Sequence, residues 1–133
     1  MHKNNIVHRD IKPQNILKVN SNEYVISDYG EGINLNDAEK YEDVMYCRGE
    51  YDLAGTPYFM DPILHKSYLI WQRNKRITPK AVVDLFKTDI YSMGLSLLNA
   101  ATGKSIKSIN TEKNKFQDCY KMVHELALPI QMK

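Results

Sequence analysis

Residues 8–15 read His-Arg-Asp-Ile-Lys-Pro-Gln-Asn, and this polar cluster directly follows a short apolar stretch, Ile6-Val7. Two further apolar runs come next, residues 16–19 and 24–26, separated by the polar link 20–23. Strand-forming residues on both sides of a short polar link are typical of a β-hairpin. We therefore expect a short strand, then a polar loop, then a small hairpin.

The middle of the chain, residues 28–62, is punctuated by glycine and shows no sustained hydrophobic periodicity. Such a pattern predicts a long loop, and long loops in compact domains are usually functional or disordered. Residues 28–55 contain no Ser and no Thr, and beyond Asp28 they hold seven acidic residues against Lys40 and Arg48.

The second half of the chain is predicted to be helical. Thr78-Pro79 resembles an N-cap followed by proline at the first helical position, which predicts a helix over residues 80–86. Residues 88–102 place apolar side chains on several faces, which indicates a helix buried all round and ended by Gly103. A last amphipathic helix is expected over residues 112–126.

Four motifs, in order along the chain, carry a resemblance to a known family. Residues 8–15 match H-R-D-x-K-P-x-N at every defined position, and Asp28-Tyr29-Gly30 resembles D-F-G with Tyr in place of Phe. Residues 55–60, Gly-Thr-Pro-Tyr-Phe-Met, resemble the G-T-x-x-Y-M run, and residues 87–94 resemble the D-x-W-S-x-G start of a large central helix. The chain is therefore identified as a member of the eukaryotic-type protein kinase family, serine/threonine class.

The resemblance implies an α+β fold: the mainly helical C-terminal lobe of the protein-kinase fold, with a small β-hairpin. Residues 1–133 would form a partial kinase domain, with a catalytic loop at 8–15, an activation segment at 28–63 and a central helix at about 88–102. The sequence contains no G-x-G-x-x-G loop and no V-A-I-K strand. We therefore expect the N-terminal, ATP-clamping lobe to be absent from this chain.

The resemblance also assigns chemical roles, because phosphoryl transfer depends on positioning and on charge stabilisation. Asp10 would accept the proton of the substrate hydroxyl, and Lys12 would reach the γ-phosphate of ATP as a compact positive charge. The presence of Lys12 is what places the chain in the serine/threonine class. Asn15 and Asp28 would supply oxygen ligands to Mg²⁺, which takes few protein ligands beside phosphate and water.

Three further residues have supporting roles by the same resemblance. Thr56 would hydrogen-bond to Asp10 and Lys12, and Asp89 would bond the backbone of the catalytic loop from the central helix. Arg9 would pair with the activation segment, where kinases commonly carry a phosphate.

Because residues 28–55 offer no Ser or Thr, we predict that Arg9 pairs instead with a fixed carboxylate, Glu50 or Asp52. Two other interpretations stay open. The acidic residues are simply solvated, or the segment is phosphorylated on one of its tyrosines (Tyr41, Tyr46 or Tyr51).

The chain also departs from the family pattern. The A-P-E motif reads Asp61-Pro62-Ile63, so its glutamate is missing, and no evident arginine partner follows Arg76. The basic stretch 72–76 is expected to be an exposed loop. His8 is expected to be structural, and no constellation is evident for the other histidines (His2, His65 and His124).

Composition excludes several classes of function. A net charge of +2 is too balanced for a nucleic-acid footprint, and no apolar run is long enough to span a membrane. The absence of a signal sequence and of clustered cysteines indicates the cell interior and no cysteine-based metal site. The predicted function is a protein serine/threonine kinase that uses ATP and Mg²⁺ on a protein substrate. The alternatives are a kinase-like binding module and an inactive fragment.

Overall fold

The computed structural model describes residues 1–37, 48–75 and 80–106, and the structural statements that follow concern these residues. The strands are β1 (Ile6–Val7), β2 (Ile16–Lys18), β3 (Tyr24–Ile26), β4 (Ile33–Asn34), β5 (Arg48–Asp52) and β6 (Lys80–Asp84). The α-helices are α1 (Pro62–Arg73) and α2 (Leu85–Thr102). Short 3₁₀ turns lie at His2–Asn4, Pro13–Asn15, Leu35–Asp37 and Pro57–Phe59.

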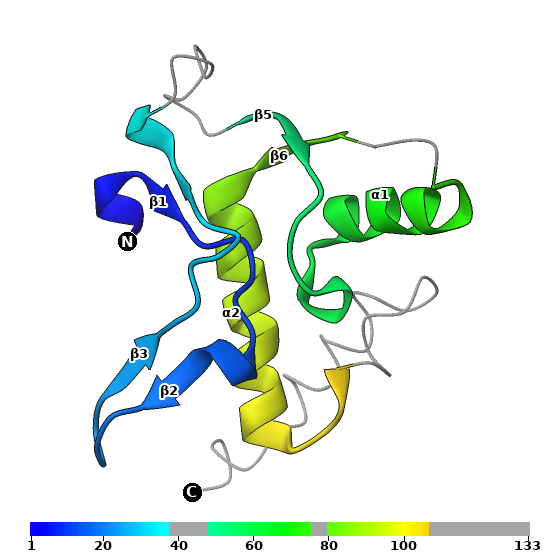
Figure 1. Ribbon diagram of the computed structural model, residues 1–133. Helices are drawn as coiled ribbons and strands as arrows, with labels where there is room; N and C mark the ends of the chain where they lie inside the picture. Colours follow the sequence, from blue (N-terminus) through cyan, green and yellow to red (C-terminus); the bar gives the residue numbers. More distant parts are fainter. Residues whose placement is uncertain (38–47, 76–79, 107–133) are drawn as a thin grey trace, which may run out of the picture.

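Helix α2 is the central element of the described fold. Figure 1 shows it running through the middle of the molecule, with the β2–β3 hairpin on one side and α1 on the other. The strands form three antiparallel pairs, β1 with β4, β2 with β3 and β5 with β6. The described part is therefore α+β, with small strand pairs arranged around one long helix.

The strand at Ile6-Val7 and the hairpin are confirmed. In the hairpin, Ile16 pairs with Ile26 and Lys18 with Tyr24. The turn is held locally, because the Val19 N–H donates to the Glu23 carbonyl at 2.9 Å and the Asn20 side-chain amide donates to the Glu23 carboxylate at 2.8 Å.

The predicted helix over residues 80–86 is wrong, because residues 80–84 form strand β6. Ala81 and Val83 are buried while Val82 between them is exposed, and this alternation is the period of a strand. Helix α2 begins at Leu85, where the Asp84 carboxylate caps it by accepting from the Lys87 N–H at 3.2 Å. The predicted N-cap at Thr78-Pro79 lies outside the described residues.

Helix α1 is an element that sequence reasoning missed. Asp61 caps it, accepting from the N–H groups of Ile63 at 2.8 Å and Leu64 at 3.3 Å, and Pro62 occupies the first position. Of the stretch 72–76 that we expected to be a loop, Gln72 and Arg73 instead end this helix, although both are exposed.

Three further predictions concern the long loop and the ends of the helices. The long loop over residues 28–62 contains strands β4 and β5. The predicted cap at Gly103 is confirmed, since this residue has a left-handed φ of 64° and its N–H donates to the Asn99 carbonyl. The helix predicted over residues 112–126 lies outside the described residues.

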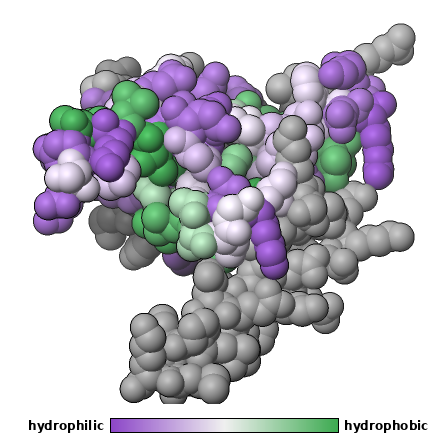
Figure 2. All heavy atoms as spheres, turned by 90° about the horizontal axis from the view of Figure 1, so that it is seen from below, coloured by the Kyte–Doolittle hydropathy of each residue, from purple (hydrophilic) through white to green (hydrophobic). Residues whose placement is uncertain are grey.

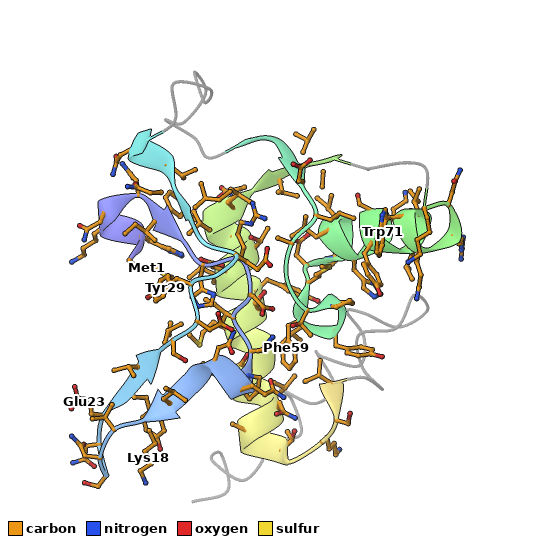
Figure 3. The ribbon with its side chains drawn as sticks, viewed as in Figure 1. Met1, Lys18, Glu23, Tyr29, Phe59 and Trp71 are labelled. Carbon is orange, nitrogen blue, oxygen red and sulfur yellow. The ribbon has the colours of Figure 1, made fainter. Side chains whose placement is uncertain are left out.

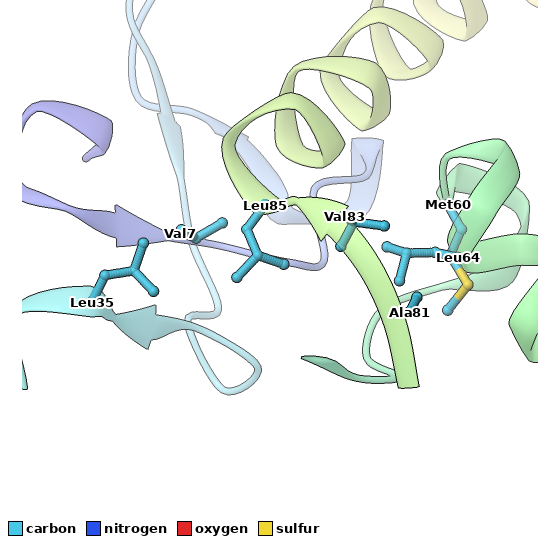
Figure 4. Close-up of a cluster of buried hydrophobic side chains, with 7 residues drawn as sticks. All are labelled: Val7, Leu35, Met60, Leu64, Ala81, Val83 and Leu85. Carbon is cyan, nitrogen blue, oxygen red and sulfur yellow. The ribbon is translucent and has the colours of Figure 1, made fainter. Parts of the chain in front are cut away.

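Two apolar clusters pack against α2. Figure 4 shows the larger one, in which Leu85 lies between the side chains of Val7 and Leu35 and a second group around Val83. The full set is Val7, Leu35, Met60, Leu64, Ala81, Val83 and Leu85. The smaller cluster comprises Phe59, Leu95, Leu98 and Ile106. These clusters anchor the start of α2 to β1 and α1, and its later turns to the segment around Phe59.

The prediction that α2 is buried all round is wrong for the described structure. Ile90 and Leu97 are 63% and 60% exposed. The space-filling view in Figure 2 likewise shows apolar groups reaching the surface among hydrophilic ones. Within the described ranges no helix has the length and hydropathy needed to cross a membrane.

Candidate active site

The candidate site is built around Asp10, in the loop between β1 and β2. One carboxylate oxygen of Asp10 accepts from the Thr56 N–H at 2.8 Å and from the Thr56 hydroxyl at 2.7 Å. The other oxygen accepts from the Lys12 ammonium at 2.6 Å, and this ammonium also donates to the Thr56 hydroxyl at 2.9 Å. Residues far apart in sequence thus form one closed, partly buried cluster.

This cluster determines the charge state of Asp10. Burial alone would raise the pKa of its carboxyl group, but the hydrogen bonds from Lys12 and Thr56 and the positive charge of Lys12 outweigh it. The pKa of Asp10 is therefore lowered from its ordinary value. Asp10 is a carboxylate at neutral pH and can accept a hydrogen bond from an incoming hydroxyl.

Gly55 allows Thr56 to approach the loop so closely. Its φ of 99° lies in a region that favours glycine, and a Cβ built on it would meet the Arg9 carbonyl oxygen at 2.3 Å. Any side chain here would push Thr56 and Asp10 apart.

The backbone of Ser27 links the two segments that carry Asn15 and Asp28, the two predicted Mg²⁺ ligands. The Asn15 amide nitrogen donates to the Asp10 carbonyl at 2.9 Å, and its side-chain oxygen is not used in this bond. The Asn15 backbone carbonyl accepts from the Ser27 N–H at 2.8 Å, and Asp28 follows directly, exposed and with a left-handed φ of 63°.

This donor set fits Mg²⁺. It offers hard oxygen atoms from an amide and a carboxylate, and Mg²⁺ is commonly held by only one or two protein carboxylates plus phosphate oxygens and water. Among the described residues no group of three or more His, Cys, Asp or Glu is placed to hold a metal without such help.

His8 is a fully buried connector between the loop and the end of β3. Its Nδ1 accepts from the Asp10 N–H at 3.2 Å, so its Nε2 carries the proton and donates to the Ser27 carbonyl at 2.9 Å. The ring of Tyr29, labelled in Figure 3, lies 4.8 Å from that of His8. Tyr in place of Phe therefore still packs at this position.

Asp89 fastens the loop to α2. It is 1% exposed, and its two oxygens accept from the N–H groups of His8 and Arg9, each at 2.8 Å. Arg9 takes a left-handed φ of 68°, which lets successive N–H groups converge on one carboxylate.

His2 also reaches this point, and sequence reasoning missed it. Its Nε2 lies 2.9 Å from the Asp89 carboxylate, and its ring is tilted against that of Phe86, with 4.8 Å between the ring centroids. The two partners are separated by 87 positions, so no local pattern could reveal the contact. His65 is buried in α1, away from the site, and His124 lies outside the described residues.

Arg9 lies beside a carboxylate that we did not single out. Its guanidinium is 3.9 Å from the exposed carboxylate of Glu31, three positions after Asp28. Asp52 is exposed, and the side chain of Glu50 lies outside the described part. Pairing of Arg9 with either of those two residues stays a prediction.

Comparison with known proteins identifies the family of the chain. The model of the family described as "Protein kinase domain" matches residues 1–132. The chain belongs to the protein kinase family. It is 30% identical over 103 residues to the serine/threonine-protein kinase KIC1 of Saccharomyces cerevisiae, with 77% of this chain and 8% of that protein covered.

Two other kinases show similar likeness. The chain is 38% identical over 97 residues to a putative serine/threonine-protein kinase, R436, of Acanthamoeba polyphaga mimivirus, covering 73% of the chain and 28% of that protein. It is 32% identical over 104 residues to mitogen-activated protein kinase kinase kinase 3 of Arabidopsis thaliana, covering 78% and 13%. This kinase chain therefore spans less than a third of each of these relatives.

Proposed function

We propose that the chain is the C-terminal lobe of a protein serine/threonine kinase, and that it carries the residues that transfer the γ-phosphoryl group of ATP to a protein hydroxyl. The observation that carries this proposal is the cluster of Asp10, Lys12 and Thr56. An ionised carboxylate and an ammonium group lie 2.6 Å apart, so a base and a phosphate-binding cation meet at one point.

The steps follow from these atoms. The hydroxyl of the substrate donates a hydrogen bond to Asp10, which aligns its oxygen with the γ-phosphorus. As that oxygen bonds to phosphorus, the bond to the leaving ADP breaks and Asp10 takes the hydroxyl proton. Lys12 turns to the phosphoryl oxygens, where negative charge is spread in the transition state.

The nucleotide side of the site rests on the β2–β3 hairpin and its flanks. The side-chain oxygens of Asn15 and Asp28 would hold Mg²⁺, which neutralises charge on the phosphate groups when bound. Leu17 and Val25 lie opposite each other in the hairpin and are exposed, so they offer an apolar surface next to Asn15 for the adenine ring.

The test joins this chain behind an N-terminal kinase lobe that carries a glycine-rich loop and the ATP-binding lysine. Transfer of radiolabelled phosphate from ATP to serine and threonine peptides is then measured. Asp10→Asn should lower kcat by at least about 100-fold, because an amide cannot accept the proton. Lys12→Arg should also fall short of normal activity, although it keeps a positive charge, because the planar guanidinium fork replaces a compact ammonium group.

Glu23→Gln is the matched control, since it removes an exposed carboxylate in the hairpin turn and should leave kcat unchanged. Nucleotide binding without turnover by the unsubstituted fusion would refute the proposed activity. Near-normal turnover by the Asp10→Asn variant would remove Asp10 from its role as the base.

A further inference from the structure

A cavity lies away from the Asp10 cluster, where the N-terminal ends of α1 and α2 meet strand β6. Its volume is about 460 Å³, within the range of small-ligand and side-chain pockets. The walls include the apolar side chains of Ile63, Val82 and Val83 and the charged residues Asp61, Asp84 and Lys87. None of Asp10, Lys12 or Thr56 lines it, so it is a separate site.

Asp61 leaves one carboxylate oxygen without a partner. The residue is only 9% exposed, and its Oδ1 accepts both capping bonds from the start of α1. The other oxygen, Oδ2, is buried and makes no hydrogen bond within the described structure. Buried polar atoms in folded proteins nearly always have partners, so a donor from another molecule would complete this site.

Asp61 also has no cation beside it among the described lining residues. The only cation among those residues, Lys87, lies 3.8 Å from Asp84 and extends mostly into solvent. Asp84 is thereby paired, whereas Asp61 has no such neighbour in the lining. Ile63 stands where the family has the glutamate of A-P-E, so this site differs from the family's ion pair.

The exposed apolar wall determines what kind of cation fits. Val82 is 62% exposed and Ile63 is also exposed, so a long aliphatic stem can lie across them. Arginine combines such a stem with a weakly hydrated charged head, which makes it the preferred cation for buried ion pairs at interfaces.

We propose that this cavity is a recognition site for an arginine side chain of a protein partner. The guanidinium donates to Asp61 Oδ2 once a small shift of the surrounding side chains uncovers this oxygen, which has less than 1 Å² of accessible surface in the unbound chain. The stem packs on Ile63 and Val82. The site does not take part in phosphoryl transfer, so failure of the proposed kinase activity would leave it untouched.

The test uses the whole chain and a blocked Ala-Arg-Ala peptide, with Ala-citrulline-Ala as the uncharged equivalent, followed by NMR. The arginine peptide should shift the amide signals of Val82, Val83 and Thr88 in a saturable way. The citrulline peptide should bind at least about tenfold more weakly. Asp61→Asn should weaken arginine binding by a similar factor, because it removes the charge while keeping an oxygen for the cap.

Val82→Lys is the second variant, because it alters only an exposed wall residue and places a competing charge at the cavity. It should also weaken binding by about tenfold or more, and circular dichroism should show an unchanged fold. Equal binding of the citrulline peptide, unchanged binding by both variants, or the lack of saturable shifts at the cavity would overturn the proposal.

Discussion

The two faces of α2 depart from the usual pattern of a helix in a globular protein. Beside its leucines, the face turned into the molecule carries four buried polar residues, Thr88, Asp89, Ser92 and Ser96. The opposite face exposes Ile90 and Leu97, positions that are usually polar in an amphipathic helix. The comparison shows that the buried face of α2 is organised by hydrogen bonds as much as by apolar contact.

The buried polar face is fully hydrogen-bonded. The Thr88 hydroxyl donates to the Leu85 carbonyl at 2.7 Å, and the Ser96 hydroxyl donates to the Ser92 carbonyl at 2.8 Å. The Ser92 hydroxyl donates to the Phe59 carbonyl at 2.8 Å, which ties α2 to the segment that presents Thr56. With Asp89, this face therefore holds both halves of the candidate active site.

The apolar face has a different character. Ile90, Gly94 and Leu97 lie on one side of α2, and a Cβ added at Gly94 would meet no atom within 4 Å. The described structure thus leaves open space over this face. Its residues should contribute little to the stability of the chain, whereas those of the polar face should be sensitive to change.

The largest effect is expected at Asp89. Asp89→Ala leaves the buried N–H of His8 and the N–H of Arg9 without their acceptor, at a cost of about 1–3 kcal/mol for each buried group. Phosphotransfer by the fused kinase should fall by more than about 100-fold, because the loop that positions Asp10 is released. Ile90→Ala, one position along α2, is the control and should change the unfolding free energy by about 0.5 kcal/mol or less. If the two substitutions lowered the unfolding free energy equally in denaturant melts, the proposed difference between the two faces of α2 would be wrong.

Two glycines extend the comparison. Gly55→Ala should reduce activity sharply and destabilise the chain, because the new Cβ would lie 2.3 Å from the Arg9 carbonyl oxygen. Gly94→Ala should instead stabilise the chain by about 0.5–1 kcal/mol, since alanine is favoured in an open helical position. Thermal melts of both variants measure the changes in stability, and kinetics of the fused kinase measure the change in activity. Destabilisation by Gly94→Ala would show that the apolar face is covered.

Part of this fold and of the candidate site could be predicted from the sequence, and part could not. The Asp10–Lys12 pair and the hairpin were predictable, since their residues are neighbours and their motif is specific. The start of helix α1 was indicated by Asp61-Pro62, a cap followed by proline. We instead assigned these residues to the A-P-E motif at the end of a predicted loop. Strand β6 was obscured by the helix-start signal of Thr78-Pro79. The exposure of the Ile90 and Leu97 face of α2 was not predictable, because the sequence places apolar residues on all faces and only tertiary structure tells which face is covered.

A pH-dependent effect is expected from Asp10. Its pKa is lowered in the folded chain by Lys12 and Thr56 in spite of burial, so the carboxylate stabilises the fold at pH values above its unfolded pKa of about 4. This contribution is lost as pH falls through the folded pKa. The difference in unfolding free energy between wild type and Asp10→Asn should therefore be constant above about pH 5 and shrink below pH 4. A difference that does not change with pH would contradict the proposed charge cluster.

The smallest effect on stability is expected on the apolar face. The chain alone should be marginally stable, bind a hydrophobic dye and lack measurable kinase activity. Ile90→Gln combined with Leu97→Gln should reduce dye binding while changing the unfolding free energy by no more than about 0.5 kcal/mol per site. A cooperative melt with low dye binding, together with Mg²⁺-dependent peptide phosphorylation by the chain alone, would disprove this expectation.

Amide hydrogen exchange at His8 and Arg9 tests most directly whether the polar face of α2 holds the loop at residues 8–15. Both N–H groups bond the Asp89 carboxylate, so both should be protected in the wild-type chain and in Ile90→Ala. In Asp89→Ala they should exchange much faster, while the amides of the β2–β3 hairpin keep their wild-type rates. Rapid exchange of His8 and Arg9 in the wild-type chain, or unchanged protection in Asp89→Ala, would contradict the account.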